Sequence, residues 1–279
     1  MNKKPIIEAE ELVKIMHQSN VKIFDVRGKW NGNPIEARSA YDDLHIEGAV
    51  FLDWTRRFVE ADTPLHLAAV ADQTIANQSF EELGISVDDT VVLYDDYRHM
   101  LAGRVWWSLR YYGFPKVKVL NGGWKYWKQK QLPVTSEVPV RSKGDFKVNY
   151  NKSLRTSMTE LIKAKNDVNL IDARGAKGYN GKAEDPRTGH IPGAINIPYT
   201  DVLDTETGLF KSEAELRKIF EEKLPDFNHK KVISSCGAGY SGTVILQALM
   251  LTGEEAPLFD DSFSVWKLDD SRPVEQGEI

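Results

Sequence analysis

Short apolar, β-branched runs alternate with segments of helical periodicity along this chain of 279 residues. In the second half, residues 213–224 place apolar side chains at helical spacing, namely Leu216, Ile219, Phe220 and Leu224. Residues 231–235 have the composition of a buried strand, and 242–253 that of a helix. Further strands are predicted within 168–174, 193–199 and 255–260.

This alternation predicts the class of fold. Strands separated by helical segments form a parallel sheet, because each helical crossover returns the chain to the end of the sheet at which the previous strand began. Such a sheet is covered by helices on both faces. We therefore expect an α/β protein whose ligands bind at the carboxyl ends of its strands.

The pattern occurs twice, in the same order. The matching stretches are "IFDVRG" (23–28) with "LIDARG" (170–175), "HIEGAVFLD" (45–53) with "HIPGAINIP" (190–198), "VVLYD" (91–95) with "VISSC" (232–236) and "LNGGWKYW" (120–127) with "FDDSFSVW" (259–266). The chain is therefore expected to contain two copies of one unit. Residues 136–153 contain proline and charged residues without helical periodicity, which is typical of a linker.

Composition narrows the classes of function. The hydrophobic fraction of 41% and the charged fraction of 28% are those of an ordinary globular protein. The net charge of −5, with both signs interspersed, gives no indication of a nucleic-acid surface. The sequence contains neither an apolar run of membrane-spanning length nor the apolar core of a signal peptide. We expect a cytoplasmic protein that binds neither nucleic acid nor membranes.

The single cysteine excludes an intramolecular disulfide and a zinc site built on paired thiols. It lies in "SSCGAGYSGTV" (234–244), which also contains the pattern G-x-G-x-x-G. A dinucleotide site is disfavoured, because the repeat partner of this loop lacks the glycines and too few residues follow it to complete a nucleotide-binding half.

The loop is better suited to a charged sulfur atom. Cys236 stands where the strand 231–235 ends, and small residues after it allow successive backbone N–H groups to turn inward as an anion-binding nest. The helix that follows adds its positive N-terminal end. Both features favour a thiolate. An inert, buried cysteine after a strand is the alternative, since cysteine is among the most buried residue types.

Two other cysteine chemistries are disfavoured. A phosphatase needs an arginine to hold the phosphate, whereas positions 241–243 are Ser, Gly and Thr. A Cys–His protease needs a general base beside the sulfur. His45 and His190 belong to the repeated "HIxGA" and are expected to hold a turn together instead.

With "DVRG" and "DARG", "HIEGA" and "HIPGA", residues 104–124 and the cysteine loop, nearly the whole chain resembles the tandem rhodanese-like sulfurtransferases. The resemblance implies two rhodanese-like α/β domains, each a parallel sheet with helices on both faces. The N-terminal domain (1–135) would be catalytically silent, with Asp95 at the position of the cysteine. A linker (136–153) and a catalytic domain (154–279) would follow.

The resemblance also implies a mechanism. Cys236 would take a sulfane sulfur from a small-molecule donor as a persulfide and pass it to a thiophilic acceptor, such as cyanide or the thiol of a thioredoxin-like protein. No cofactor or metal would take part. The cradle of backbone N–H groups would come from Gly237, Ala238, Gly239, Tyr240, Ser241 and Gly242.

The sequence indicates the identity of the sulfur donor less clearly. Ala238 replaces the serine that 3-mercaptopyruvate enzymes of this family carry in the loop, and Thr55 replaces the second acid of their Asp-x-Asp. The basic loop residues of thiosulfate enzymes are absent too. Because two mercaptopyruvate-type groups are missing, thiosulfate is slightly favoured over 3-mercaptopyruvate.

Three residues are candidates for donor binding by the same resemblance. Arg187 matches an arginine of the mercaptopyruvate pattern and would hold an anionic donor, unless it is an ordinary surface arginine. Lys177 lies next to the position of a second family arginine, and His66 matches a family histidine. The alternative function is that of a rhodanese-type module that binds proteins without catalysis, for which Cys236 would be dispensable.

Overall fold

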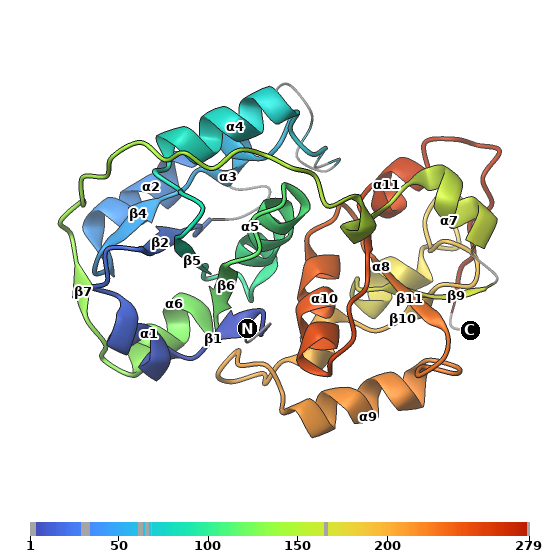
Figure 1. Cartoon of the computed structure of the whole chain (residues 1–279). Coiled ribbons are helices and arrows are strands. Elements are labelled where there is room, and N and C mark those ends of the chain that lie inside the picture. The colour runs from blue at the N-terminus through green and yellow to red at the C-terminus, as the bar shows by residue number, and fades with distance from the viewer. Residues whose placement is uncertain are drawn as a thin grey trace. The chain divides into compact units, whose positions relative to one another are not determined.

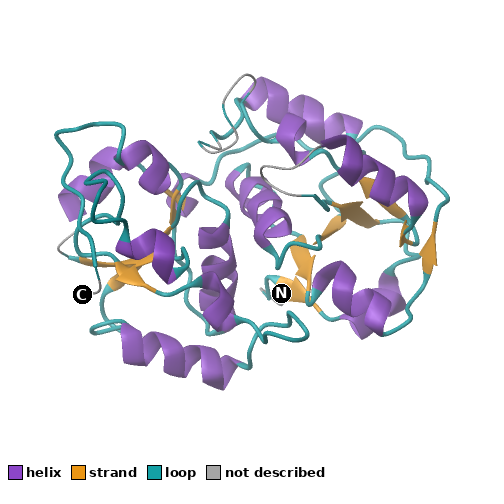
Figure 2. Cartoon of the chain, turned by 180° about the vertical axis from the view of Figure 1, so that it is seen from behind, coloured by secondary structure: helices purple, strands orange, loops and turns teal. Residues whose placement is uncertain are grey.

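The computed structural model describes residues 4–28, 34–60, 64, 67, 69–164 and 167–277 (Figure 1). The chain divides into two compact units. The first contains the described residues of 4–65 and 69–151 together with residues 206–209, and the second contains residue 67 and the described residues of 152–205 and 210–277. Each unit is an α/β structure in which helices surround a central sheet (Figure 2).

The first unit begins with a short strand and alternates strands with helices. Its elements are β1 (Ile6–Ile7), α1 (Ala9–Ile15), β2 (Val21–Asp25), α2 (Pro34–Asp43), β3 (His45–Ile46), β4 (Ala49–Phe51), α3 (Trp54–Arg57), α4 (Gln73–Glu82), β5 (Thr90–Tyr94), α5 (Met100–Tyr111), β6 (Val117–Leu120), α6 (Gly123–Gln129) and β7 (Val134–Thr135). Five strands form a parallel sheet in the order β1-β6-β5-β2-β4. Strands β3 and β7 form a separate antiparallel pair.

The second unit repeats this plan. Its elements are the 3₁₀ turn η1 (Lys152–Leu154), β8 (Arg155–Thr156), α7 (Met158–Ala164), β9 (Val168–Asp172), α8 (Ala176–Asn180), β10 (Ile195–Asn196), the 3₁₀ turn η2 (Tyr199–Val202), α9 (Glu213–Lys223), β11 (Lys231–Ser235), α10 (Ser241–Leu251), β12 (Leu258–Phe259) and α11 (Ser262–Trp266). Its parallel sheet has the order β10-β9-β11-β12-β8.

The predicted elements of the second half are all present, but two strands are shorter than expected. The strand predicted at 193–199 is reduced to β10, which is followed by Pro198, and that predicted at 255–260 is reduced to β12, which begins directly after Pro257. Proline has no N–H group to donate to a neighbouring strand, so each strand is confined to the residues on one side of the ring.

Helices cover both faces of each sheet, as predicted. In the first unit, Ile23 and Val92 of the sheet pack in one cluster with Leu12 of α1 and Trp127 of α6. Helix α5 packs against β5 and β6 outside this cluster. In the second unit, α7, α8 and α11 contribute to the corresponding cluster, while α10 packs against β11 and β12.

Paired side chains mark the repeat inside the cores. Trp127 donates its indole N–H to the carbonyl oxygen of Pro133 at 3.0 Å, and Trp266 donates to Pro273 at 2.9 Å. In both units this hydrogen bond fixes a buried ring to the chain that leaves its helix. A large ring buried with its polar atom satisfied contributes strongly to stability.

The two histidines of "HIxGA" have the structural role expected of them. His45 stacks on Tyr41 with ring centroids 3.9 Å apart, and its Nδ1 lies 2.7 Å from the Tyr41 carbonyl oxygen. His190 stacks on Tyr179 at 3.7 Å with the same Nδ1 contact at 2.9 Å. Burial raises the pKa of Tyr179 to about 12, so the ring stays neutral in this stack.

Residues 136–151, predicted as part of a linker, form no helix or strand and belong to the first unit. Arg141 donates from Nη2 to the carbonyl oxygens of Ile23 and Gly48 at 2.9 and 3.0 Å, and its guanidinium lies over the ring of Phe24. Phe146 is buried against Phe80. The segment is therefore fixed to the first unit by packing and hydrogen bonds.

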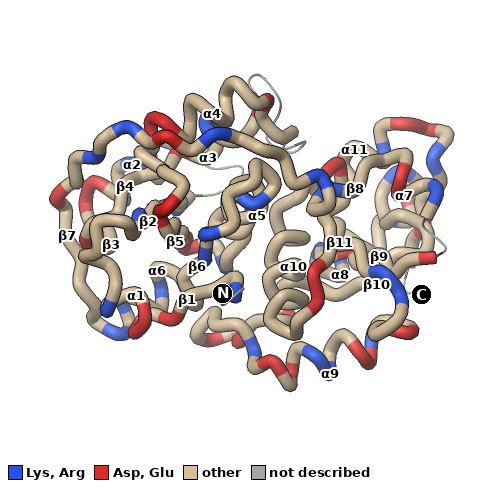
Figure 3. Tube along the Cα trace, in the orientation of Figure 1, with Lys and Arg blue, Asp and Glu red and all other residues tan. Residues whose placement is uncertain are grey.

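Charge is distributed unevenly among the helices (Figure 3). Helix α9 carries acidic and basic residues along its length, whereas α10 carries none. Every residue of α10 from Ser241 to Leu249 is buried. An uncharged helix that is buried along most of its length belongs to a protein interior, so α10 is part of the core behind the cysteine loop.

We predict that Trp266→Ala destabilises the protein by about 3–5 kcal/mol, because the ring is 2% exposed and its hydrogen bond to Pro273 is lost with it. Leu268→Ala is the matched control, because that side chain is 67% exposed and should change stability by less than about 0.5 kcal/mol. Denaturant unfolding of both variants measures the difference. Equal unfolding curves for the two would contradict this account of the core.

Candidate active site

Cys236 follows β11 directly and precedes α10 by the loop residues 237–240. Strand β11 lies between β9 and β12, so the cysteine stands at the carboxyl end of a central strand. Its side chain is 1% exposed. The location predicted from the sequence, at the end of a strand and before a helix, is therefore the one observed.

The sulfur atom accepts a hydrogen bond from the loop itself. The backbone N–H of Gly239 donates to Cys236 Sγ at 3.1 Å. Gly239 has φ +77°, a conformation that a residue with a side chain adopts only at a steric cost. The glycine is therefore needed to turn its N–H group back toward the sulfur.

Backbone hydrogen bonds hold the loop against its neighbours. Phe263 N–H donates to the Cys236 carbonyl oxygen at 3.0 Å, and Ser264 N–H donates to that of Gly237 at 3.0 Å. At the far end of the loop, Thr243 donates from both its N–H and its hydroxyl to the carbonyl oxygen of Tyr240. The sulfur thus rests on a fixed backbone at the positive end of α10.

An arginine lies beside the loop. Arg174 makes hydrogen bonds through Nε and Nη2 to the carboxylate of Asp172, at 2.5–3.1 Å, and donates to the Gly189 carbonyl oxygen at 2.6 Å. Its guanidinium lies 4.3 Å from the ring centre of Phe263. A Cβ at Gly237 would lie 3.6 Å from the Cδ of Arg174. The loop and this arginine are therefore near neighbours, at a distance that would still admit a side-chain Cβ at 237.

The first unit has the same arrangement around Asp25 and Arg27. Arg27 binds the Asp25 carboxylate through Nε at 2.8 and 3.1 Å and lies 4.3 Å from the ring centre of Trp124. The repeated "DVRG" and "DARG" therefore encode an internal ion pair next to the loop in each unit. The sequence marked these residues as a repeat but did not assign them this place.

Asp95, which stands at the position of Cys236 in the first unit, is almost fully buried and accepts four hydrogen bonds. Oδ1 accepts from the N–H groups of Tyr97 and His99 at 3.0 Å, and Oδ2 from those of Leu101 and Ala102 at 2.9 Å. The loop before α5 is therefore an anion-binding nest whose anion is its own carboxylate. The same strand–loop–helix geometry surrounds the sulfur in the second unit.

Of the predicted cradle, Gly239 is the residue whose N–H donates to the sulfur, and a contribution from the other five residues stays a prediction. Ala238 and Tyr240 are buried, and Ser241 and Gly242 begin α10. A Cβ at Gly242 would approach Leu258 Cδ1 to 2.9 Å, so the Leu258 side chain would have to shift to admit one. Gly242 thus lets α10 pack closely on Leu258 of β12.

Arg187 is bound to the chain near the end of the second unit. It donates from Nη1 to the Arg272 carbonyl oxygen at 2.9 Å and from Nη2 to those of Lys267 and Asp269 at 2.6 and 3.0 Å. These donors hold residues 267–272 in place. In the structure, Arg187 uses its Nη1 and Nη2 groups for these backbone contacts. Donor binding by Arg187 stays a prediction.

The two other candidates for donor binding are less closely tied to the loop. Lys177 is exposed on α8. His66 lies outside the described residues. For both, binding of a donor stays a prediction.

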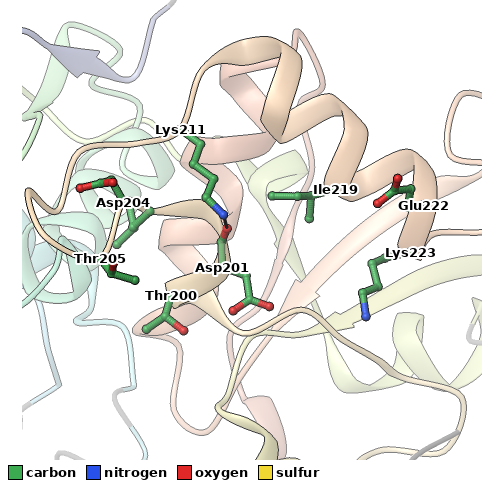
Figure 4. A pocket seen from close by; sticks show the side chains of 9 residues that line it. Thr200, Asp201, Asp204, Thr205, Lys211, Ile219, Glu222 and Lys223 are labelled. Carbon is green, nitrogen blue, oxygen red and sulfur yellow. Dashed lines mark hydrogen bonds between the residues drawn. The ribbon is translucent and has the colours of Figure 1, made fainter.

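A separate hollow of about 430 Å³ lies in the second unit, between η2 and α9 (Figure 4). It is lined by side chains of both charges, including Asp201, Lys211 and Glu222, and Lys211 Nζ donates to the Asp201 carbonyl oxygen at 2.7 Å. None of its lining residues belongs to the loop 236–242. It is therefore distinct from the cysteine site.

Two features are absent from the residues that the structure describes. No group of three or more His, Cys, Asp or Glu side chains is arranged to hold a metal ion. Within the same ranges, no helix combines the length and apolar character that a membrane crossing requires.

Comparison with known proteins identifies the class. The model of the rhodanese-like domain matches residues 8–130 and 156–269. A 3-mercaptopyruvate sulfurtransferase of Escherichia coli strain K12 is 31% identical over 279 residues, covering 96% of this chain and 97% of the relative. This chain belongs to the rhodanese-like family, with two domains in tandem.

Relatives with a different donor in their name match as well. A thiosulfate sulfurtransferase of Bos taurus is 34% identical over 241 residues, covering 83% of this chain and 80% of the relative. Among solved structures, SseA of Escherichia coli, a 3-mercaptopyruvate sulfotransferase, superimposes with a TM-score of 0.82 at 29% identity, covering 93% of this chain and 98% of that one. Overall likeness therefore does not discriminate between the two donors.

We predict that Asp95→Asn destabilises the protein by about 3 kcal/mol or more, because the amide presents N–H groups to backbone donors that now share one carboxylate. Asp145→Asn, on an exposed side chain, is the control and should be nearly neutral. Urea unfolding at neutral pH measures both. A change of less than about 1 kcal/mol for Asp95→Asn would contradict the nest.

Proposed function

We propose that this protein is a sulfurtransferase that moves a sulfane sulfur from a small-molecule donor to a thiophilic acceptor through a persulfide on Cys236. The observation that carries the proposal is the sulfur of Cys236 at the carboxyl end of a central strand, with the Gly239 N–H donating to it at 3.1 Å. Membership of the rhodanese-like family and the names of the relatives support the same chemistry.

In the first half of the reaction, the Cys236 thiolate attacks the outer sulfur of the donor. With thiosulfate, a bond forms between Sγ and that sulfur, the donor's S–S bond breaks, and sulfite leaves with the electron pair. With 3-mercaptopyruvate, the C–S bond breaks and the carbon takes up a proton to give pyruvate. No external oxidant or reductant is needed. The outer sulfur of thiosulfate already has the oxidation state of sulfane sulfur, whereas in 3-mercaptopyruvate the two-electron oxidation of the thiol sulfur is balanced by reduction of its carbon to the methyl group of pyruvate.

In the second half, a nucleophilic acceptor attacks the outer sulfur of the persulfide. With cyanide, a carbon–sulfur bond forms, the Sγ–S bond breaks and Cys236 is released as a thiolate. A thiol acceptor reacts in the same way and becomes a persulfide itself. Both halves place negative charge on Sγ, which the Gly239 N–H and the N-terminal end of α10 stabilise.

The donor is proposed to be thiosulfate rather than 3-mercaptopyruvate. Ala238 is a buried methyl group where the mercaptopyruvate enzymes carry a serine hydroxyl, and Thr55 replaces their second acid. A hydroxyl that stabilises a carbanion-like leaving group is therefore absent from this position, whereas sulfite leaves readily without it. Arg187, Lys177 and His66 remain predicted donor-binding residues.

Mass spectrometry of the intact protein tests the proposal. After exposure to thiosulfate, Cys236 is expected to gain the mass of one sulfur atom, and subsequent cyanide should remove it and release thiocyanate. Cys236→Ser should gain nothing, since the chain has a single cysteine. If neither thiosulfate nor 3-mercaptopyruvate adds sulfur, the enzyme proposal fails, and a Cys236→Ser variant that retains function would favour a protein-binding module.

The Gly239 contact gives a second prediction. Gly239→Ala should slow sulfur loading by about tenfold, because the left-handed backbone is strained and the N–H turns away from Sγ. Gly253→Ala is the matched control: it also has positive φ, but a Cβ there meets no atom within 4 Å. Similar loss of stability in both, with loss of loading only in Gly239→Ala, is the expected result. Equal loading rates would contradict the role of this N–H group.

A further inference from the structure

Ser262, the first residue of α11, has an unusual backbone conformation beside Cys236. Its φ is +54°, in the left-handed region that favours glycine. It is fully buried. A non-glycine residue held in this region near reactive groups indicates that its side chain has a role that outweighs the steric cost.

The hydroxyl of Ser262 is placed between the cysteine and a carbonyl group. Its Oγ accepts a hydrogen bond from the Cys236 N–H at 3.3 Å and lies 3.8 Å from Cys236 Sγ. It also donates to the Phe259 carbonyl oxygen at 3.0 Å. One hydroxyl hydrogen therefore has two acceptors within reach, a carbonyl oxygen and, when Cys236 is ionised, a thiolate.

The first unit provides an internal comparison. Gly123 occupies the same place, as the first residue of α6 with φ +55°, and in both units the next residue donates its N–H to the carbonyl oxygen of the loop residue, Asp95 or Cys236. A Cβ at Gly123 would collide with the Asp95 carbonyl oxygen. The unit without the thiol thus has glycine, and the unit with the thiol has serine at the same φ.

We propose that Ser262 is a positioning residue for the Cys236 sulfur. With the thiol, the Ser262 O–H donates to Phe259, and when Sγ is a thiolate the O–H rotates to donate to it. No proton leaves the serine, because only its torsion angle changes. This inference rests on the proposed function, since it assigns the hydroxyl to the two moments at which Sγ is charged: attack on the donor and release from the persulfide.

Other charged groups surround this part of the unit. Arg174 and Asp172 form an ion pair beside the loop, and Arg155 pairs with Asp260 and Asp261 next to Ser262. Burial raises the pKa of the Asp261 carboxyl. Replacing the serine by alanine or glycine changes none of these charges. A difference between those variants and the unaltered protein therefore reports the hydroxyl.

The experiment compares Ser262→Ala, Ser262→Gly and Ser271→Ala in the full chain. Because the chain has one cysteine, the ultraviolet absorbance of the thiolate across pH, with Cys236→Ser as the blank, reads this group alone. We expect the midpoint to rise by about 0.5–1 pH unit in both Ser262 variants, since a hydrogen bond to the charged form is lost. Ser271, an exposed serine bound to Asp269, should give no change.

Stability and sulfur loading are measured on the same variants. Glycine relieves the left-handed strain and alanine does not, so Ser262→Gly should melt at a higher temperature than Ser262→Ala, while both load sulfur from thiosulfate about tenfold more slowly. If Ser262 has only a structural role, the rate of sulfur loading should follow the stability of each variant, and the pH midpoint of thiolate formation should stay unchanged. Either of these outcomes would overturn the inference.

The failure of this inference can be told apart from failure of the proposed function. If the unaltered protein takes no sulfur from thiosulfate or 3-mercaptopyruvate, the proposed function fails. The pH midpoint of the thiolate still decides whether Ser262 acts on Sγ, because that measurement requires no sulfur donor. A shifted midpoint together with normal loading would contradict the assignment of Ser262 to the reaction.

Discussion

Backbone N–H groups at the start of a buried helix need acceptors, and this requirement shapes both units of the protein. In the first unit, two N–H groups of the loop before α5 and two of the first turn of α5 donate to the carboxylate of Asp95. In the second, the Gly239 N–H is directed onto the sulfur of Cys236 before α10. The sheet fixes where the strand ends, and packing in the core fixes where the helix begins. The acceptor of these N–H groups must therefore be the residue that directly follows the strand.

The choice of acceptor distinguishes the two units chemically. A carboxylate that accepts four backbone hydrogen bonds is a stable occupant of the nest, and these four donors are not available to a bound anion. A cysteine sulfur accepts hydrogen bonds from fewer N–H groups than a carboxylate does, but it can form and break covalent bonds with a second sulfur. The same backbone thus holds a carboxylate in one unit and a cysteine sulfur in the other, with Gly123 and Ser262 as the corresponding difference on the neighbouring helix.

Much of this arrangement could be predicted from residue order. The repeat, the α/β class, the end of β11 at Ser235 and the place of Cys236 all follow from local periodicity, which depends on neighbours in sequence. The stacked histidines of "HIxGA" were also predicted as structural. Residues 136–153 were predicted as a linker between the domains. Arg141 and Phe146 hold residues 136–151 to the first unit, and only their partners in β2 and α4 could decide this.

The contacts around the sulfur required the tertiary structure. Ser262 and Arg174 come from chain segments 26 and 62 residues away from Cys236, and spacing in sequence does not state which side chains converge. The aligned pair Gly123 and Ser262 was visible as a mismatch, but its meaning depends on a positive φ that packing imposes. The sequence by itself determined where Cys236 stands and where the strand before it ends, because these are local properties. The tertiary structure alone decided which donors surround its sulfur atom, because they depend on how distant elements pack.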